Sequence, residues 1–398
     1  MNYGAPWWLP DGNMQTIWAA LRARRFMGPA PVFRRERWTT PDSDFVDVDW
    51  LNYEASTLAT SCAALPLQGA TPPEAAHRQA VQARAGGLGA AAFSPEGAAA
   101  PAARQSRFRG PGWHGTSEAI SIALLPPAPT RERPLLVVFH GLEGSSASHY
   151  AQVFADVARS RGWACAVPHF RGCSGELNLA PRAYHSGDFA EIDWILRRFA
   201  AQHAGPVLAV GISLGGNALM RWAAELGAEA QSLVAGIASV CSPLDLAASG
   251  WAISRGFNRH VYTRIFLRTM VPKALQKLDQ HPGLFDRQRL LAVRDLHEFD
   301  NVFTAPIHGF KDADDYWARA SAKPHLLKVA VPALALNSLN DPFVPAASLP
   351  QAGDVSRHIT LWRPAQGGHV GFPSSGFPAH VRAMPEAVAA FLAAQLHA

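Results

Sequence analysis

The sequence predicts an α/β fold in which a mostly parallel central sheet is covered by helices on both faces. From residue 135 onward, short and almost wholly apolar segments alternate with amphipathic segments of helical period. Strands that are apolar on both sides are typical of parallel sheets buried between two layers of helices. At 398 residues, with 48% hydrophobic and 17% charged residues, the chain can bury a large globular core.

Two elements precede this alternation. The apolar periodicity predicts a short amphipathic helix over Met14 to Leu21. The segments Glu36 to Thr40 and Phe45 to Leu51 flank the turn formers Pro41 to Asp44, a pattern typical of a β-hairpin. A further strand is predicted over Ser117 to Leu125.

The alternating part itself contains six predicted strands and four predicted helices. The strands are Leu135–Phe139, Trp163–Pro168, Val207–Val210, Val234–Val240, Val331–Asn337 and His358–Trp362. The helices are Ser148–Arg161, Gly187–Ala201, Gly215–Leu226 and Met384–Leu396. Because ligands of open α/β sheets bind outside the carboxyl ends of the strands, we expect the functional residues in the loops that follow them.

Two segments interrupt the pattern. Residues 55–112 are rich in Ala, Gly and Pro and poor in large apolar side chains, so we expect a flexible, low-complexity insertion. The segment 241–330 is too long for a bare loop and is predicted to form a helical cap over the sheet, an ordinary surface excursion being the alternative. Its helical patterns lie around Arg255–Thr269, Pro272–Leu278 and Arg287–Phe299. The predicted organisation is an N-terminal segment with the hairpin (1–54), the insertion (55–112), the first part of the core (113–240), the cap (241–330) and the last part of the core (331–398).

One turn carries the most chemical information. Gly211-Ile212-Ser213-Leu214-Gly215 follows the predicted strand Val207–Val210 and opens the predicted helix directly after it. Strand, Gly-x-Ser-x-Gly and helix form the nucleophile elbow of α/β-hydrolases, which exposes a serine hydroxyl above the sheet edge. The alternative is a glycine-rich turn with a chance serine.

A serine hydroxyl becomes a good nucleophile only when an oriented base takes its proton. In α/β-hydrolases the acid and then the histidine follow the serine along the chain. Asp341 and His369 come in that order, each in a loop after a predicted strand, so we predict a triad of Ser213, Asp341 and His369. Asp354 is the reserve acid, but it precedes the last strand instead of following the one before it.

Acyl transfer also needs hydrogen-bond donors for the oxyanion. The glycine-rich loop after Leu135–Phe139 and the residue after the nucleophile supply these donors in this fold. We therefore predict the backbone N–H groups of Leu142 and Leu214 as donors, with Gly141 letting the main chain approach the substrate.

A set of short motifs resembles the YheT-like α/β-hydrolase family over about residues 1–53 and 133–396. The motifs that carry the resemblance are Asn13-Met-Gln-Thr16, His140-Gly-Leu-Glu-Gly-Ser-Ser146, Phe170-Arg-Gly-Cys-Ser-Gly-Glu176, Tyr184-His-Ser-Gly187, Gly211–Asn217, Glu298-Phe-Asp300, Thr304-Ala-Pro306, Ala313-Asp-Asp-Tyr316 and Asn340-Asp-Pro-Phe343. The resemblance implies a serine hydrolase that acts on carboxylic esters with Ser213, Asp341 and His369 as triad and without a metal. Members of the family resemble esterases and monoacylglycerol-type lipases.

Composition narrows the other possibilities. Four scattered cysteines without a C-x-x-C pair argue against a disulfide framework and a thiolate zinc site, and no histidine cluster indicates a metal, so no cofactor is expected. The chain shows no signal-peptide pattern and no apolar run that could span a bilayer, which favours a cytoplasmic protein with, at most, peripheral membrane contact. An arginine cluster near the N-terminus is interpreted as a solvated face, because no nucleic-acid-binding motif accompanies it. Its members are Arg22, Arg24, Arg25, Arg34, Arg35 and Arg37.

The expected partner is a small-molecule ester. Apolar cap residues are predicted to line an acyl pocket for short-to-medium acyl esters or monoacylglycerols, namely Ile265, Phe266, Leu267 and Met270. A thioesterase or amidase with the same triad is one alternative. Another is a non-catalytic protein that binds a membrane surface through its arginines and Trp7, Trp8 and Trp18.

Three side chains outside the triad are also assigned. Arg171 follows a strand and is predicted either to line the pocket or to pair with a cap carboxylate such as Asp314 or Asp315. His140 and His185 are predicted to be structural.

Overall fold

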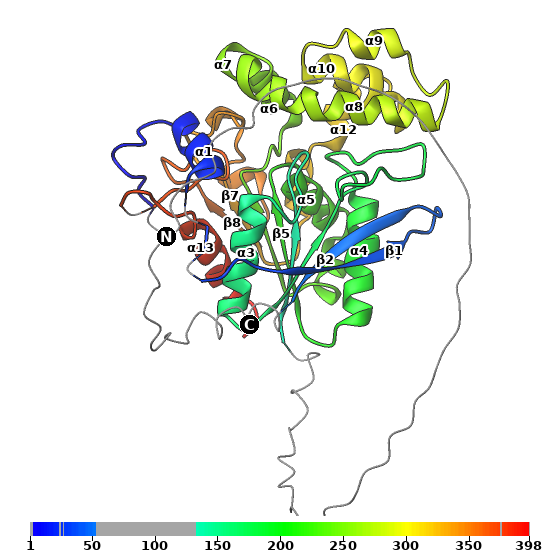
Figure 1. The fold of residues 1–398 in the computed structure, drawn as a ribbon. Helices are drawn as coiled ribbons and strands as arrows, with labels where there is room; N and C mark the ends of the chain where they lie inside the picture. Colours follow the sequence, from blue (N-terminus) through cyan, green and yellow to red (C-terminus); the bar gives the residue numbers. More distant parts are fainter. Residues whose placement is uncertain (1–2, 24, 27, 53–132, 375, 398) are drawn as a thin grey trace, which may run out of the picture. The chain divides into compact units, whose positions relative to one another are not determined.

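Eight strands form one sheet in the computed structural model, which describes residues 3–23, 25–26, 28–52, 133–374 and 376–397 (Figure 1). The predicted insertion at 55–112 and the predicted strand Ser117 to Leu125 lie outside the described residues. The strands are β1 (Phe33–Thr39), β2 (Phe45–Leu51), β3 (Leu135–Phe139), β4 (Ala164–Pro168), β5 (Val207–Ile212), β6 (Gly236–Val240), β7 (Ala333–Leu336) and β8 (Ile359–Trp362).

The spatial order of the strands is β1-β2-β4-β3-β5-β6-β7-β8. β1 and β2 pair antiparallel, as do β2 and β4, whereas every pairing from β4 to β8 is parallel. The predicted mostly parallel sheet is therefore confirmed, and each of the six strands predicted after residue 133 is present with ends shifted by at most two residues. All parallel strands point their carboxyl ends at the same sheet edge, where the predicted functional loops meet.

Helices cover both faces of this sheet. The helices that flank it are α1 (Gly12–Leu21), α3 (His149–Ser160), α4 (Phe189–Gln202), α5 (Leu214–Leu226) and α13 (Ala383–Ala394). Successive side chains of β3 point to opposite faces: Val137 packs in the cluster that holds α4 and α5 residues, and Val138 in the cluster that holds α3 and α13 residues. This alternation explains why the strand is apolar throughout, since both of its faces are buried.

The turn between β1 and β2 supplies partners of Arg171 that were not predicted. Arg171 pairs with Asp42, Asp44 and Glu191, not with Asp314 or Asp315. The reason is topological: β2 runs antiparallel to β4, so the hairpin turn that starts β2 lies beside the loop that ends β4. Asp314 and Asp315 have other partners: Asp314 pairs with His297, and Asp315 pairs with Arg319.

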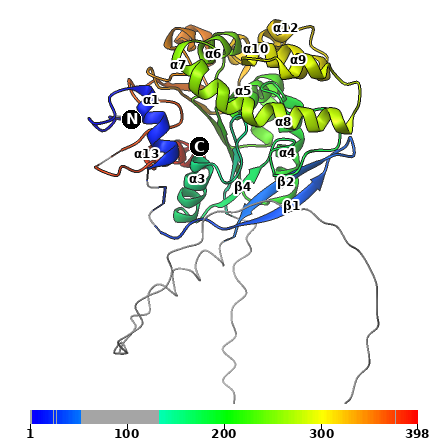
Figure 2. The same ribbon diagram turned by 45° about the horizontal axis from the view of Figure 1, so that its top comes forward.

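Helices also fill the segment between β6 and β7, and Figure 2 shows them along one edge of the sheet. They are α6 (Leu246–Ile253), α7 (Gly256–Asn258), α8 (Arg264–Gln280), α9 (Arg287–Leu291), α10 (Leu296–Phe299), α11 (Ala305–Ile307) and α12 (Ala313–Ala320). Within the part of the chain that the structure describes, no helix is both long and apolar enough to cross a membrane.

Two of the helical patterns predicted in this segment have different ends in the structure. The patterns around Arg255–Thr269 and Pro272–Leu278 share one helix, because α8 continues through Pro272. Pro272 and Arg268, whose carbonyl loses its helical partner, are both exposed, so water can satisfy that carbonyl. The single helix expected over Arg287–Phe299 is divided, since the Asp295 carboxylate accepts the N–H of Glu298 and starts α10 anew.

Candidate active site

Ser213 occupies the tight turn between β5 and α5. Its backbone has φ 52° and ψ −118°, a conformation that a non-glycine residue adopts only when its surroundings impose it. A Cβ at Gly211 would lie 2.4 Å from the Cα of Gly216, and one at Gly215 would lie 2.5 Å from the carbonyl oxygen of His140. Both flanking positions therefore require glycine, and the predicted elbow geometry is the one that the turn adopts.

Asp341 and His369 lie next to Ser213, although 128 and 156 residues separate them from it along the chain. His369 Nε2 is 3.0 Å from Ser213 Oγ, and His369 Nδ1 is 2.9 Å from Asp341 Oδ2. Asp341 is fixed in turn, because its Oδ1 accepts the N–H groups of Phe343 and Val344. Asp354, the reserve acid, instead accepts the N–H of Gln351 in a capping turn.

Helix α1 holds the loop that carries His369. Thr16 Oγ1 accepts the N–H of His369 at 2.8 Å, and the fully buried Gln15 accepts the N–H of Gly367 at 2.8 Å. Gln15 Oε1 also accepts from Asn340 Nδ2, whose own Oδ1 accepts the N–H of Gly368. Gln15 and Thr16 of the N-terminal helix thus connect the aspartate loop with the histidine loop.

The loop after β3 lies beside the elbow because β3 pairs with β5, Phe139 opposite Gly211. Leu142 and Leu214 both line the cavity above Ser213, and none of the hydrogen bonds among the described residues uses either N–H group. The loop is shaped by the fully buried His140, whose ring contacts the carbonyl of Gly141 and accepts the N–H of Phe170. Burial lowers the pKa of His140 to about 3, so the ring stays neutral and fills a structural position.

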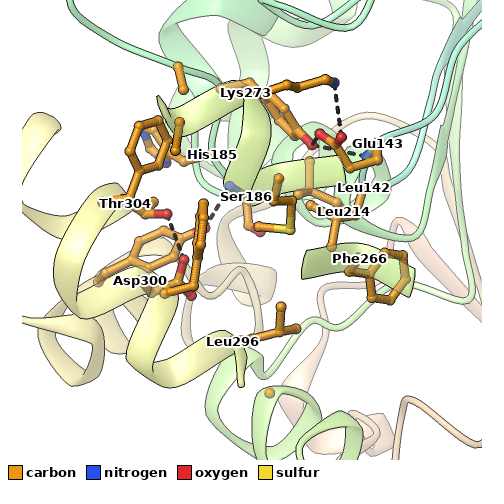
Figure 3. A pocket seen from close by; sticks show the side chains of 18 of the residues that line it. Leu142, Glu143, His185, Ser186, Leu214, Phe266, Lys273, Leu296, Asp300 and Thr304 are labelled. Carbon is orange, nitrogen blue, oxygen red and sulfur yellow. Dashed lines mark hydrogen bonds and ion pairs between the residues drawn. The ribbon is translucent and has the colours of Figure 1, made fainter. Parts of the chain in front are cut away.

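Ser213 lines a largely apolar cavity with an empty volume of about 1080 Å³, part of it open to solvent. Figure 3 shows this cavity with Leu142 and Leu214 on one side and Asp300 on another. Phe266 and Met270 line it as predicted, and Arg171 and His185 reach it as well. The predictions for Ile265 and Leu267 were wrong, since both line a separate surface hollow beside Arg264. The reason is helical geometry: Phe266 and Met270 are four residues apart and share one face of α8, whereas Ile265 and Leu267 are turned away from that face.

Two further positions bear on this cavity. Asp300 lines it with a half-buried side chain, whose carboxylate accepts hydrogen bonds from Thr304 Oγ1 and Trp317 Nε1. Burial raises the pKa of Asp300 to about 6. Gly141 does not line the cavity but lies against the elbow, where a Cβ would come within 3.2 Å of the Ser213 Cβ.

Metal-ligand geometry is absent from the described ranges: no group of three or more His, Cys, Asp or Glu there is arranged to hold a metal ion. The buried cysteines Cys165, Cys173 and Cys241 are free thiols. Cys241 supports the histidine loop, because its sulfur accepts the N–H of Val370.

The order of the strands, the turn at Ser213 and the positions of the loops that carry Asp341 and His369 are those of an α/β-hydrolase. Comparison with known proteins leads to the same class. Residues 134–375 match the family model described as the alpha/beta hydrolase fold. The protein YheT of Escherichia coli (strain K12) is 41% identical over 251 residues, covering 62% of this chain and 72% of YheT. The chain therefore belongs to the α/β-hydrolase family, within its YheT-like group.

Two more distant relatives carry the names of lipid hydrolases. The Homo sapiens phospholipase ABHD3 is 27% identical over 255 residues, 62% of this chain and 60% of the relative. The monoacylglycerol lipase of Saccharomyces cerevisiae (strain ATCC 204508 / S288c) is 27% identical over 250 residues, 60% of this chain and 55% of the relative. The family thus includes hydrolases with esterase and lipase members.

Several residues that shape the site were not predicted from the sequence. Gln15, Thr16, Tyr150, Tyr184 and Lys273 all make hydrogen bonds or ion pairs to the loops of the site. Gln15, Thr16 and Tyr184 lie in motifs that carry the family resemblance, but a motif does not tell which loop a polar side chain reaches.

Proposed function

We propose that this protein is a serine hydrolase that cleaves carboxylic esters through an acyl-enzyme intermediate. The observation that carries the proposal is His369 placed between Ser213 Oγ at 3.0 Å and Asp341 Oδ2 at 2.9 Å. If Nδ1–H donates to Asp341, Nε2 keeps its lone pair and can accept the proton of the serine hydroxyl.

In the first half-reaction, Ser213 Oγ forms a bond with the ester carbonyl carbon while its proton passes to His369 Nε2. The tetrahedral oxyanion accepts the N–H groups of Leu142 and Leu214, and the N-terminal end of α5 adds a favourable dipole. When the carbon–oxygen bond to the alcohol breaks, His369 returns the proton to the leaving alkoxide. Water then repeats the sequence, with His369 as base, and releases the carboxylic acid and free Ser213.

The cavity supports a short-to-medium acyl chain as the group that is transferred. Its lining near Ser213 is largely apolar, with Phe266 and Met270 from α8 and Phe299 and Phe303 from the helices opposite. Monoacylglycerols fit the same chemistry, and the printed names of two relatives point to lipid esters.

A panel of p-nitrophenyl esters from acetate to decanoate tests this proposal, assayed with the wild type, Ser213→Ala and Asp341→Asn. We expect the serine variant to lose turnover almost completely and the aspartate variant to lose about 10⁴-fold in kcat. Unchanged hydrolysis by Ser213→Ala would refute the proposal. Matched thioesters and anilides in the same panel decide whether a thioesterase or amidase describes the protein better.

A specific surface feature favours membrane contact as an accompanying property. Trp8, Trp18 and Phe377 pack together with ring centroids 4.8 to 5.7 Å apart, and Trp7 and Phe377 are 90% and 78% exposed. Aromatic side chains of this kind insert favourably at a lipid–water boundary. Co-sedimentation with phosphatidylcholine vesicles should fall when Trp7 and Phe377 are both changed to Ser, and equal sedimentation of variant and wild type would rule the contact out.

Two arginines of the N-terminal cluster already have acidic partners within the protein and are less available to a membrane surface. Arg35 pairs with Asp49, and Arg37 pairs with Asp47 and Glu176. These arginines hold the hairpin instead of forming a free basic face.

A further inference from the structure

Tyrosine hydroxyls fix the loop after β3 on both sides of Leu142. The N–H of Gly141 donates to Tyr150 Oη at 2.9 Å, and the N–H of Glu143 donates to Tyr184 Oη at 2.9 Å. The carbonyl of Gly141 accepts the N–H of Gly144, and the His140 ring contacts it at 2.8 Å. Because a trans peptide points its N–H opposite to its carbonyl, the N–H of Leu142 faces away from these partners.

The residue after Leu142 is held in an unfavourable backbone conformation. Glu143 has φ 56°, at the third position of the turn that the Gly144 N–H closes on Gly141. Glycine or asparagine is the usual residue at such a position. A glutamate there is strained, and it keeps this conformation only when its surroundings hold it.

The side chain of Glu143 supplies that hold. Its carboxylate accepts a hydrogen bond from Tyr184 Oη at 2.8 Å and pairs with Lys273 Nζ of α8 at 2.9 Å (Figure 3). Tyr184 is itself fixed by stacking on Phe170 with an interplanar angle of 9°. Burial raises the pKa of Tyr184 well above its ordinary value, so the phenol keeps the proton that it donates.

The pair between Glu143 and Lys273 connects two parts of the fold. Glu143 belongs to the loop at the sheet edge, and Lys273 belongs to α8, which contributes Phe266 and Met270 to the cavity. The Glu143 side chain is 10% exposed and that of Lys273 is 34% exposed, so the pair is partly shielded from water. A shielded pair with a shared tyrosine hydrogen bond fixes geometry better than an exposed one.

We propose that Glu143, Tyr184 and Lys273 are positioning residues for the oxyanion. They hold the Leu142 N–H toward the cavity, and Lys273 makes this orientation depend on the position of α8. The inference rests on the proposed function, since it assigns these residues to the stabilisation of the tetrahedral intermediate. An ordinary clasp between α8 and the core would affect stability but not the intermediate.

The test compares Lys273→Met, Tyr184→Phe and Glu143→Gln with the wild type in ester kinetics and in binding of phenylboronic acid. This boronic acid forms a tetrahedral adduct with a nucleophilic serine and so reports on the oxyanion donors. Lys323→Met is the matched control, because it removes a lysine whose contact with Asp245 is 4.0 Å and lies outside the cavity lining.

We expect Lys273→Met and Tyr184→Phe to lower kcat at least about 10-fold, and by no more than the roughly 10²- to 10³-fold that complete loss of a donor costs. KM should stay within about twofold, and the boronic acid should bind more weakly by the same factor as kcat falls. Lys273→Arg should restore most of the activity, and Lys273→Met should add little to Glu143→Gln because both remove one pair.

Unchanged kcat and boronic acid affinity in Lys273→Met, with only a lower melting temperature, would overturn the inference and leave ester hydrolysis standing. An absence of ester turnover in both the wild type and Lys323→Met would overturn the proposed function and this inference together. If Tyr184→Phe does not fold, the partly exposed Lys273 variants still decide the question.

Discussion

At Ser213 the conformation of one residue makes the rest of the site possible. A positive φ turns the hydroxyl toward His369, and glycines at 211 and 215 give the turn the space that it needs. These features were visible in the sequence, because the spacing of glycines around the serine has a steric cause. The hydrogen bonds that hold His369 from behind were not, since Gln15 and Thr16 lie more than 350 residues away in the chain.

The contact between Thr16 and His369 leads to a prediction at this scale. Thr16→Val keeps the side-chain shape but leaves the His369 N–H without its acceptor, which costs about 1–3 kcal/mol for a buried donor. We expect lower stability by about that amount and a fall in kcat, because the imidazole is less firmly placed. Urea denaturation and ester kinetics measure the two effects. Thr39→Val on the exposed side of β1 is the control and should change stability by less than about 0.5 kcal/mol.

At the scale of elements, strands were easier to predict than the helices between β6 and β7. The buried strands are apolar throughout, and each is bounded by turn residues, so their ends moved by two residues at most. The predicted helix ends differ from the structure at two places. At Pro272 the helix continues although proline usually ends a helix, and at Asp295 a side-chain cap divides a segment of helical period. The partners of Arg171 depended on strand pairing, which periodicity alone does not reveal.

The turn of the hairpin gives a pH-dependent prediction. Asp44 is buried and accepts hydrogen bonds from Asn178 and from the N–H groups of Phe45, Leu179 and Ala180. Burial alone would raise its pKa, but these bonds outweigh burial and lower the pKa of Asp44 to about 2.

Because the pKa of Asp44 is lower in the folded than in the unfolded chain, the carboxylate stabilises the fold above about pH 4. This contribution disappears as the pH falls from about 4 toward 2. Asp44→Asn should therefore lower the free energy of unfolding by about 2 kcal/mol near pH 7, with a shrinking difference below about pH 4. Urea titrations of both proteins across this range measure it, and a difference that grows in acid would contradict the assignment.

For the whole molecule, the segment between β6 and β7 and the N-terminal helix meet the sheet edge from different sides. The first supplies apolar lining to the cavity, and α1 supports the loops of Asp341 and His369. The fold class followed from the alternation of strands and helices, but the identity of the cavity-facing residues did not, because it depends on how α8 is rotated.

Which face of α8 lies toward the substrate can be tested with one large substitution on each face of the helix. Met270→Trp places a larger ring in the cavity, so kcat/KM for octanoate should fall about 10-fold relative to acetate. Ile265→Trp adds the same bulk on the face that lies outside the cavity and should leave the ratio unchanged. A larger effect at 265 than at 270 would show that α8 presents its other face to the substrate.

The central claim is that Ser213 is the nucleophile of this protein. Labelling the wild type with a fluorophosphonate and mapping the adduct by peptide mass spectrometry tests it most directly. The account predicts one phosphonylated residue, Ser213, with labelling lost in Ser213→Ala and strongly slowed in His369→Ala. An adduct on another residue, or labelling that persists in Ser213→Ala, would contradict it.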